Sequence, residues 1–501
     1  MDSAPPITNS VAAKIPKDWL LPTSLTSQYT ETSTISVLDS VEVVTAFCKR
    51  AAIAQQCVSC LTETMFDSAL ARAAECDAYL AREGKPIGPL HGLPISLKDS
   101  FNVKGVQATI GYVSFIAHPP APANSAVVDI LLQQGAVLYV KTNLPQAMMT
   151  ADSHNNIFGR TLNPLRLDRT AGGSTGGEAA LLAMKGSVLG VSTDIAGSNR
   201  IPALCCGIKS IKPTASRVPF AGGVPVGRLG SPSAILPVIG PCGRSVRDFQ
   251  LFLKSVVGKR AWGVDADALN VPWRGISPFS RPLRFGLLRG CKERPLHPPI
   301  ARGMHHTATK LKEVGHTIVL LDDKVPDLYQ SALLAWKFFL LDPNRTPLKH
   351  IQASCEPVVP SLPTCSFPEL AEWKPNLDEL WNINVQRAEM VKAWKDNMVQ
   401  ENLDAVLMPG YQAPAPKHDT YGVPIYTVVP NLINYPACIL STGFAEKEED
   451  GTFLKDVKYE PAYEPDEVEG LPCHVQILGK PMEDEELLQI MKVVEETLGK
   501  K

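Results

Sequence analysis

The chain has 501 residues, of which 45% are hydrophobic and 20% are charged, and these proportions are typical of a soluble globular protein. Its formal net charge of −2 gives no electrostatic reason to expect nucleic acid or an anionic membrane as a partner. Because no apolar run of about 18 residues occurs, we also expect no membrane-spanning anchor.

Twelve cysteines are scattered along the chain without the spacing of a disulfide framework, and no secretory signal precedes them. The sequence therefore predicts free thiols and a cytoplasmic location. Cys57 and Cys60 form a lone C-x-x-C, which we interpret as helix thiols because no second pair or preceding strand accompanies them. The ten histidines form no H-E-x-x-H or other ligand cluster, so we expect no metal and no cofactor.

Helical and strand patterns alternate along the chain, which predicts an α/β fold with an open mixed β-sheet covered by helices. We expect a single domain over residues 1–501, although length alone would allow about three domains. Residues 1–35 are rich in Ser, Thr and Pro and are expected to form a loose N-terminal segment. In residues 41–80 apolar positions recur at three and four, which predicts an N-terminal helical region.

Lys98 stands in a predicted strand. Ile95 and Leu97 alternate with Ser96 and Lys98, so the serine and the lysine share one face of that strand. A lysine buried there would have a lowered pKa and could act as a base, whereas a solvated lysine stays charged. The local pattern by itself favours an ordinary surface lysine.

A glycine-rich loop with a serine inside it follows, with the sequence GGSTGG at residues 172–177. A loop with so few Cβ atoms allows close backbone approaches, and such loops usually serve a ligand or a reacting group. The run from Glu178 to Lys185 is rich in Ala and Leu, which predicts a helix that Gly186 ends. Ser174 would then lie just before a helix N-terminus, where free N–H groups favour negative charge.

A second serine, Ser198, is expected at a sharp turn between a short buried strand at residues 188–191 and a helix that contains Pro202 near its start. Ser198 is a candidate nucleophile and Lys98 is the best candidate for its base, although a small residue in a turn is more often structural. Successive backbone N–H groups could form an oxyanion hole there, in which a single donor contributes about 3 kcal/mol. These N–H groups belong to Ile195, Ala196, Gly197 and Ser198.

Two other interpretations of the glycine loop have to be weighed. The run GGSTG also fits the G-x-S-x-G motif, which would make Ser174 the nucleophile of an α/β-hydrolase. That motif requires a strand directly before it, and residues 163–169 have the composition of a loop. A nucleotide-binding loop is disfavoured because no lysine follows the glycines at the required position.

The C-terminal half continues the alternation of helices and strands. Residues 255–300 are interpreted as a loop-rich excursion, and residues 322–400 as a mixed region that contains four tryptophans. Asp484 is placed to cap the last helix. The other predicted elements are a helix at 300–315, strands at 317–321, 403–409 and 471–479, and a final helix at 484–498.

Together these motifs closely resemble the amidase signature family of serine hydrolases, whose pattern is GGSSGG followed by TDxGGSxR, with an upstream lysine on a strand. This chain has GGSTGG at 172–177, TDIAGSNR at 193–200 and Lys98 within PISLKDS. The separation between Ser174 and Ser198 is that of the family. The resemblance extends along nearly the whole chain and is strongest to the fungal acetamidases.

The resemblance implies amide hydrolysis by a Ser-Ser-Lys triad, with Ser198 as the nucleophile and Lys98 as the neutral base. Ser174, after a cis peptide bond, would be the bridging serine, and no histidine, metal or cofactor would be required. By position, the resemblance also implies a substrate pocket with an entrance covered by residues 322–400. The implied pocket residues are Met148, Met149, Ala151, Gly173 and Thr175, and the implied supporting residues are Asp194 and Arg200.

Three positions depart from the family pattern without removing a triad member, so they bear on substrate choice and rate. Ala196 replaces a glycine, so either its φ stays negative or the loop shifts. Asn199 replaces an apolar residue, and Thr175 replaces a serine.

The expected partner is a small-molecule amide, and the question whether the chain forms a homodimer stays open. So do two alternative functions, an esterase or acyl-transfer tailoring enzyme of a natural-product pathway and a non-hydrolytic subunit of an amidotransferase-type complex.

Overall fold

The computed structural model describes residues 14–16, 39–257 and 263–499. The loose segment predicted for residues 1–35 lies outside the described residues, except at 14–16. Of the helices in the described ranges, none combines the length and the apolarity that a membrane span requires.

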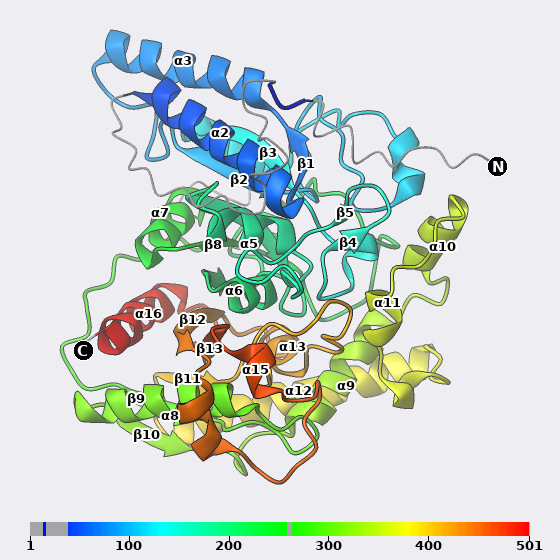
Figure 1. Cartoon of the computed structure of the whole chain (residues 1–501), viewed down its shortest axis with the longest axis vertical. Coiled ribbons are helices and arrows are strands. Elements are labelled where there is room, and N and C mark those ends of the chain that lie inside the picture. Colours follow the sequence, from blue (N-terminus) through cyan, green and yellow to red (C-terminus); the bar gives the residue numbers. More distant parts are fainter. Residues whose placement is uncertain (1–13, 17–38, 258–262, 500–501) are drawn as a thin grey trace.

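Eleven strands of the described part of the chain form one mixed sheet, with β1 and β10 at its edges (Figure 1). β2 pairs in parallel with β3 and β6, and β9 pairs in parallel with β10 and β11. The strands between these two groups pair antiparallel, so the predicted open mixed sheet is confirmed. In sheet order the strands are β1 (Leu61–Thr64), β3 (Val137–Thr142), β2 (Pro94–Lys98), β6 (Leu189–Asp194), β8 (Val238–Gly243), β7 (Lys209–Lys212), β12 (Ala437–Phe444), β13 (Pro472–Leu478), β11 (Ala405–Met408), β9 (Arg284–Leu287) and β10 (Thr317–Leu320), and a separate hairpin joins β4 (His154–Asn155) and β5 (Gly159–Arg160).

Helices cover the sheet and enclose a core on each of its faces (Figure 1). In β3, Val137 and Tyr139 belong to one core and Leu138 to the other, because successive strand residues point to opposite faces. The first core lies against α2, α3, α5 and α6, and the second contains residues of α4, α7, α8, α9, α12, α13 and α16. The helices are α2 (Ser40–Val58), α3 (Phe66–Glu83), α4 (Ala126–Gln133), α5 (Gly176–Ala183), α6 (Arg200–Cys206), α7 (Val246–Val257), α8 (Pro298–Glu313), α9 (Leu328–Phe339), α10 (Thr346–Ala353), α11 (Ser361–Thr364), α12 (Leu377–Gln400), α13 (Ile425–Leu432), α14 (Lys447–Asp450), α15 (Pro465–Val468) and α16 (Asp484–Gly499), with short 3₁₀ turns η2 (Val113–Ala117), η3 (Gln146–Met148), η5 (Pro368–Leu370) and η6 (Gly451–Phe453).

The predicted helical region at 41–80 contains two helices and a strand. α2 ends at Val58, and Ser59 takes a φ of 51° while its N–H donates to the Gln55 carbonyl over 3.0 Å. β1 follows and pairs antiparallel with β3, a long-range contact that the local apolar spacing does not reveal. Cys57 and Cys60 flank this break and form no disulfide, and the first is half-buried and the second buried.

Two further expectations are corrected in the C-terminal half. β9 lies inside the region interpreted as a loop-rich excursion, where pairing with β10 and β11 specifies it. Asp484 does not act as the expected cap, because its buried carboxylate accepts from the Thr214 N–H over 2.7 Å and from Arg217 Nη1 over 2.9 Å. Asp484 therefore anchors α16 to the segment between β7 and β8.

Candidate active site

Lys98 ends β2, and its side chain is fully buried. Its Nζ donates to Ser174 Oγ over 2.7 Å and to Thr193 Oγ1 over 3.0 Å. Ser96, two residues earlier, forms a hydrogen bond with Glu178 of α5. The serine and the lysine thus share the face predicted from the alternation in PISLK, and this face brings the lysine to the glycine loop.

Burial lowers the pKa of Lys98 to about 7, although Asp194 and, after it, Cys242 and Glu178 act in the opposite direction. A neutral amine has a lone pair and can accept a proton, which a solvated lysine does not do near neutral pH. The arrangement can therefore pass a proton between the Ser174 hydroxyl and the Lys98 amine.

The loop before α5 is shaped by close backbone packing. Gly172 has a φ of +82°, and a Cβ there would lie 2.6 Å from Pro202 Cα. A Cβ on Gly173 would lie 2.2 Å from the Thr150 carbonyl oxygen. The peptide bond between Gly173 and Ser174 is cis, and Ser174 is 2% exposed. The glycines allow the loop to pack at these distances and hold the serine against Lys98.

Ser198 lies in the turn between β6 and α6, where it lines a pocket. Gly197 before it has a φ of +118°, and a Cβ there would meet Thr427 Oγ1 at 2.1 Å. The same Thr427 hydroxyl donates to the Ala196 carbonyl over 2.8 Å. Ala196 is not among the described residues with positive φ, so alanine fits this position without the conformation that favours glycine.

A fully buried ion pair between Asp194 and Arg200 stabilises this turn. Arg200 Nη2 lies 2.9 Å from Asp194 Oδ1, and Arg200 Nε lies 3.1 Å from Asp194 Oδ2. Burial acts to raise the pKa of Asp194, but the Arg200 guanidinium holds that pKa below its ordinary value. The carboxylate also accepts the N–H groups of Gly197 over 2.8 Å and Asn199 over 3.1 Å.

The Asp194 carboxylate removes the Gly197 N–H from the candidate oxyanion donors. Because it already engages the Gly197 N–H, this group is not directed at the pocket, and Gly197 does not line the pocket. The N–H groups of Ile195, Ala196 and Ser198 stay candidates, and all three residues line the pocket.

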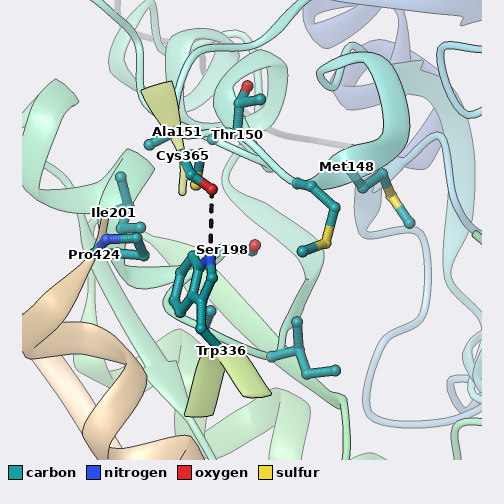
Figure 2. A pocket seen from close by; sticks show the side chains of 12 residues that line it. Met148, Thr150, Ala151, Ser198, Ile201, Trp336, Cys365 and Pro424 are labelled. Atoms are coloured by element: carbon teal, nitrogen blue, oxygen red, sulfur yellow. Dashed lines mark hydrogen bonds between the residues drawn. The ribbon is translucent and has the colours of Figure 1, made fainter. Parts of the chain in front are cut away.

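The pocket beside Ser198 has a volume of about 30 Å³ (Figure 2). Met148, Met149, Ala151 and Gly173 line it, as the resemblance implied, whereas Thr175 is buried in the loop and does not. Five lining residues were not identified as site residues in the sequence. They are Thr150, Ile201, Trp336, Cys365 and Pro424, and among them only Trp336 carried a signal, as one of the tryptophans in the region expected to cover the entrance.

Glu178 is a buried carboxyl group beside Lys98 and was not among the site residues expected from the sequence. Its Oε2 accepts from Thr142 Oγ1 over 2.8 Å, and its Oε1 accepts from Ser96 Oγ. Burial raises the pKa of Glu178 to about 7, although both hydrogen bonds and the charge of Lys98 act to lower it. The sequence offered one indication of Glu178 as a site residue. This was its position one helical turn after Ser174, on the side of the sheet that Ser96 and Lys98 face.

The structure also bears on the α/β-hydrolase interpretation of the glycine loop and on the expectation that no metal is bound. Residues 163–173, directly before Ser174, form isolated bridges but no strand, so the strand required by the G-x-S-x-G elbow is missing there. Within the described ranges, no three His, Cys, Asp or Glu side chains come together in a way that could hold a metal ion.

Comparison with known proteins defines the class to which this fold and pocket belong. The chain belongs to the amidase family, because the family model described as Amidase matches residues 42–488, and it is an enzyme that acts on amides. The protein named Amidase from Gibberella moniliformis is 36% identical, with 97% of this chain and 96% of that protein covered. The protein named Acetamidase from Emericella nidulans is 34% identical, with 92% and 87% covered.

Solved structures agree with this assignment. A structure of fatty acid amide hydrolase is 31% identical with a TM-score of 0.89, and the match covers 99% of this chain and 94% of that one. A structure titled as that of an amidase is 24% identical with a TM-score of 0.71 and covers 92% and 97%, which supports the fold.

Proposed function

We propose that this enzyme hydrolyses carboxylic amides to an acid and ammonia or an amine through an acyl-enzyme formed on Ser198. Ser174 is the bridging serine and Lys98 is the base. The observation that carries this proposal is the buried 2.7 Å hydrogen bond between Lys98 Nζ and Ser174 Oγ, next to the pocket that Gly173 and Ser198 line.

In the proposed first step, Ser198 Oγ attacks the carbonyl carbon of the amide. Its proton passes to Ser174 Oγ, while the Ser174 proton passes to Lys98 Nζ. A C–O bond forms, and the carbonyl oxygen becomes an oxyanion. The N–H groups of residues 195, 196 and 198 can donate hydrogen bonds to this oxyanion. The C–N bond then breaks, and the proton returns from Lys98 through Ser174 to the leaving nitrogen.

Water completes the proposed cycle by attacking the acyl-enzyme. Its proton follows the same path to Lys98, the acyl C–O bond to Ser198 breaks, and the acid leaves as the serine recovers its proton. Side chains and backbone N–H groups of the chain, together with water, supply every step, so we propose no cofactor. The names of the relatives support amides as the shared substrate class, since two relatives are called Acetamidase and one structural neighbour is called Fatty acid amide hydrolase. We also propose a cytoplasmic location, which is supported by the twelve cysteines, all in the described ranges and none in a disulfide.

The proposal is tested with the purified enzyme by ammonia release from acetamide and by labelling with a fluorophosphonate probe. We expect one label per chain and ammonia release, both abolished in Ser198→Ala and both retained in Ser277→Ala, an exposed serine far from the pocket in sequence. Labelling that survives in Ser198→Ala but vanishes in Ser174→Ala would support the α/β-hydrolase interpretation instead. Cleavage of ethyl esters without cleavage of amides would support the esterase alternative, and inactivity without a co-purified protein would support the subunit alternative.

A further inference from the structure

The pocket beside Ser198 is small for a substrate site. Its volume is about 30 Å³. Because a cavity needs roughly 10–15 Å³ to hold one water molecule, the pocket accommodates on the order of two water-sized groups. Apolar side chains form most of its wall, among them Met148, Ile201 and Pro424, which come from three separate segments (Figure 2). An acyl group attached to Ser198 Oγ would have to occupy this space.

Trp336 of α9 forms one wall of the pocket that Ser198 also lines (Figure 2). The indole Nε1 donates to the Cys365 carbonyl over 3.3 Å. Its ring stands edge-on to Phe339 and to Phe367, with ring centroids 5.4 Å and 5.5 Å away. The side chain is only 5% exposed, so a hydrogen bond and two aromatic contacts hold the indole in one position.

We infer that Trp336 sets the size of the acyl group and restricts the enzyme to amides of short aliphatic acids. This inference rests on the proposed acyl-enzyme at Ser198. A chain longer than a few carbons would overlap the indole, and a packed interior does not make room for extra methylenes without strain. The residue acts by excluding longer chains and takes no part in the proton transfers.

The test compares kcat/KM for acetamide, butanamide and hexanamide, measured as ammonia release. For the unmodified enzyme we expect kcat/KM for hexanamide to be at least about tenfold lower than for acetamide, as pockets that discriminate by methylene groups show. Trp336→Ala should raise the hexanamide-to-acetamide ratio by about tenfold or more. Because both substrates are measured on the same preparation, this ratio does not depend on how much of the variant is folded.

Two further variants sharpen the comparison. Trp336→Phe keeps a ring that can contact Phe339 and Phe367 but is smaller, so its ratio should lie between those of the unmodified enzyme and Trp336→Ala. Trp381→Ala is the matched control, because Trp381 on α12 is 69% exposed and should leave the ratio unchanged.

The outcomes separate this inference from the proposed function. If the unmodified enzyme prefers hexanamide, or if both Trp336 variants keep the original ratio, the role of Trp336 is overturned while amide hydrolysis stands. If no amide releases ammonia and Ser198 takes no fluorophosphonate label, the proposed function fails and this inference fails with it.

Discussion

The amine of Lys98 lies 2.7 Å from the hydroxyl of Ser174, with the lysine fully buried and the serine 2% exposed. In water, solvent would compete for both groups and keep the amine charged. Here burial removes that competition and lowers the pKa of Lys98 to about 7. The protonation state of this one amine can therefore decide whether a proton leaves the serines.

The first prediction is that amide hydrolysis rises as the pH increases through about 7 and then levels off. Below that pH the buried lysine is protonated and cannot accept the Ser174 proton, and above it the amine is free to do so. The measurement is kcat/KM for acetamide from about pH 5 to about pH 9. A profile that is flat across this range, or that falls as the pH rises, would contradict the role of Lys98 as the base.

A second prediction concerns replacement of the base. Lys98→Ala should reduce amide kcat by about a hundredfold to ten-thousandfold, the usual contribution of general acid–base catalysis. Lys98→Arg should rescue nothing, because a guanidinium does not deprotonate in a protein. The matching ester should lose less, since an alkoxide leaves more easily without a proton than an amine does. Lys395→Ala, which changes a lysine that is 62% exposed, is the control and should keep normal turnover.

The outcome that contradicts this assignment is specific. Near-normal amide turnover by Lys98→Ala, with the same rise of rate with pH, would mean that another group accepts the proton.

Much of the fold was predictable because many elements carry their own pattern. Strands β10, β11 and β13 and helices α8 and α16 lie within a few residues of their predicted positions, since local apolar spacing reports them. β1 and β9 were missed because pairing partners far along the chain specify them. Asp484 was misassigned for a related reason, since Arg217 and Thr214, which bind its carboxylate, come from a distant segment.

The residues of the site also divide into those that a local motif indicates and those that only the fold brings together. Lys98, Ser174 and Ser198 were named as candidates because they lie in the short motifs by which the chain resembles the amidase signature family. Trp336 and Cys365 were not, because a local pattern shows that a side chain is apolar or near a loop but not which cavity it reaches. Nor could the sequence show that the Gly197 N–H is engaged by a carboxylate three residues earlier, since this depends on the geometry of the turn.

A third prediction is that metal removal does not affect the reaction. The proposed steps use only Lys98, Ser174, Ser198 and backbone N–H groups, and no cluster of metal-ligating side chains occurs in the described ranges. Dialysis against a chelator should leave kcat/KM for acetamide unchanged. Loss of activity that added zinc restores would exclude this mechanism.

A fourth prediction concerns the buried pair of Asp194 and Arg200. Arg200→Ala should destabilise the protein by about 3–5 kcal/mol, because it leaves a buried carboxylate without its counter-ion. Arg289→Ala removes an ion pair to Asp322 whose arginine is 64% exposed, so its cost should be about 1 kcal/mol or less. Denaturant unfolding of the three proteins measures both differences. Equal costs for the two variants would mean that burial does not govern the strength of the Asp194 pair.

The last prediction concerns Glu178, whose pKa burial raises from 4.5 to about 7. The folded protein therefore binds this proton more tightly than the unfolded chain does, so the stability that Glu178 contributes is present below about pH 4.5 and is lost as the pH rises through about 7. Glutamine does not titrate. The melting temperature of Glu178→Gln should consequently increase relative to that of the unmodified enzyme between about pH 5 and about pH 8.

A second readout of Glu178→Gln separates this electrostatic effect from a purely structural one. The negative charge of Glu178 acts to raise the pKa of Lys98, so removing it should move the rise of amide hydrolysis to lower pH. Glu389→Gln on α12 is the control, because that carboxylate is exposed and should change neither measurement. If the melting temperatures of Glu178→Gln and the unmodified enzyme keep a constant difference with pH, and the rise of the rate does not move, then Glu178 stays in one protonation state and exerts no electrostatic control over Lys98.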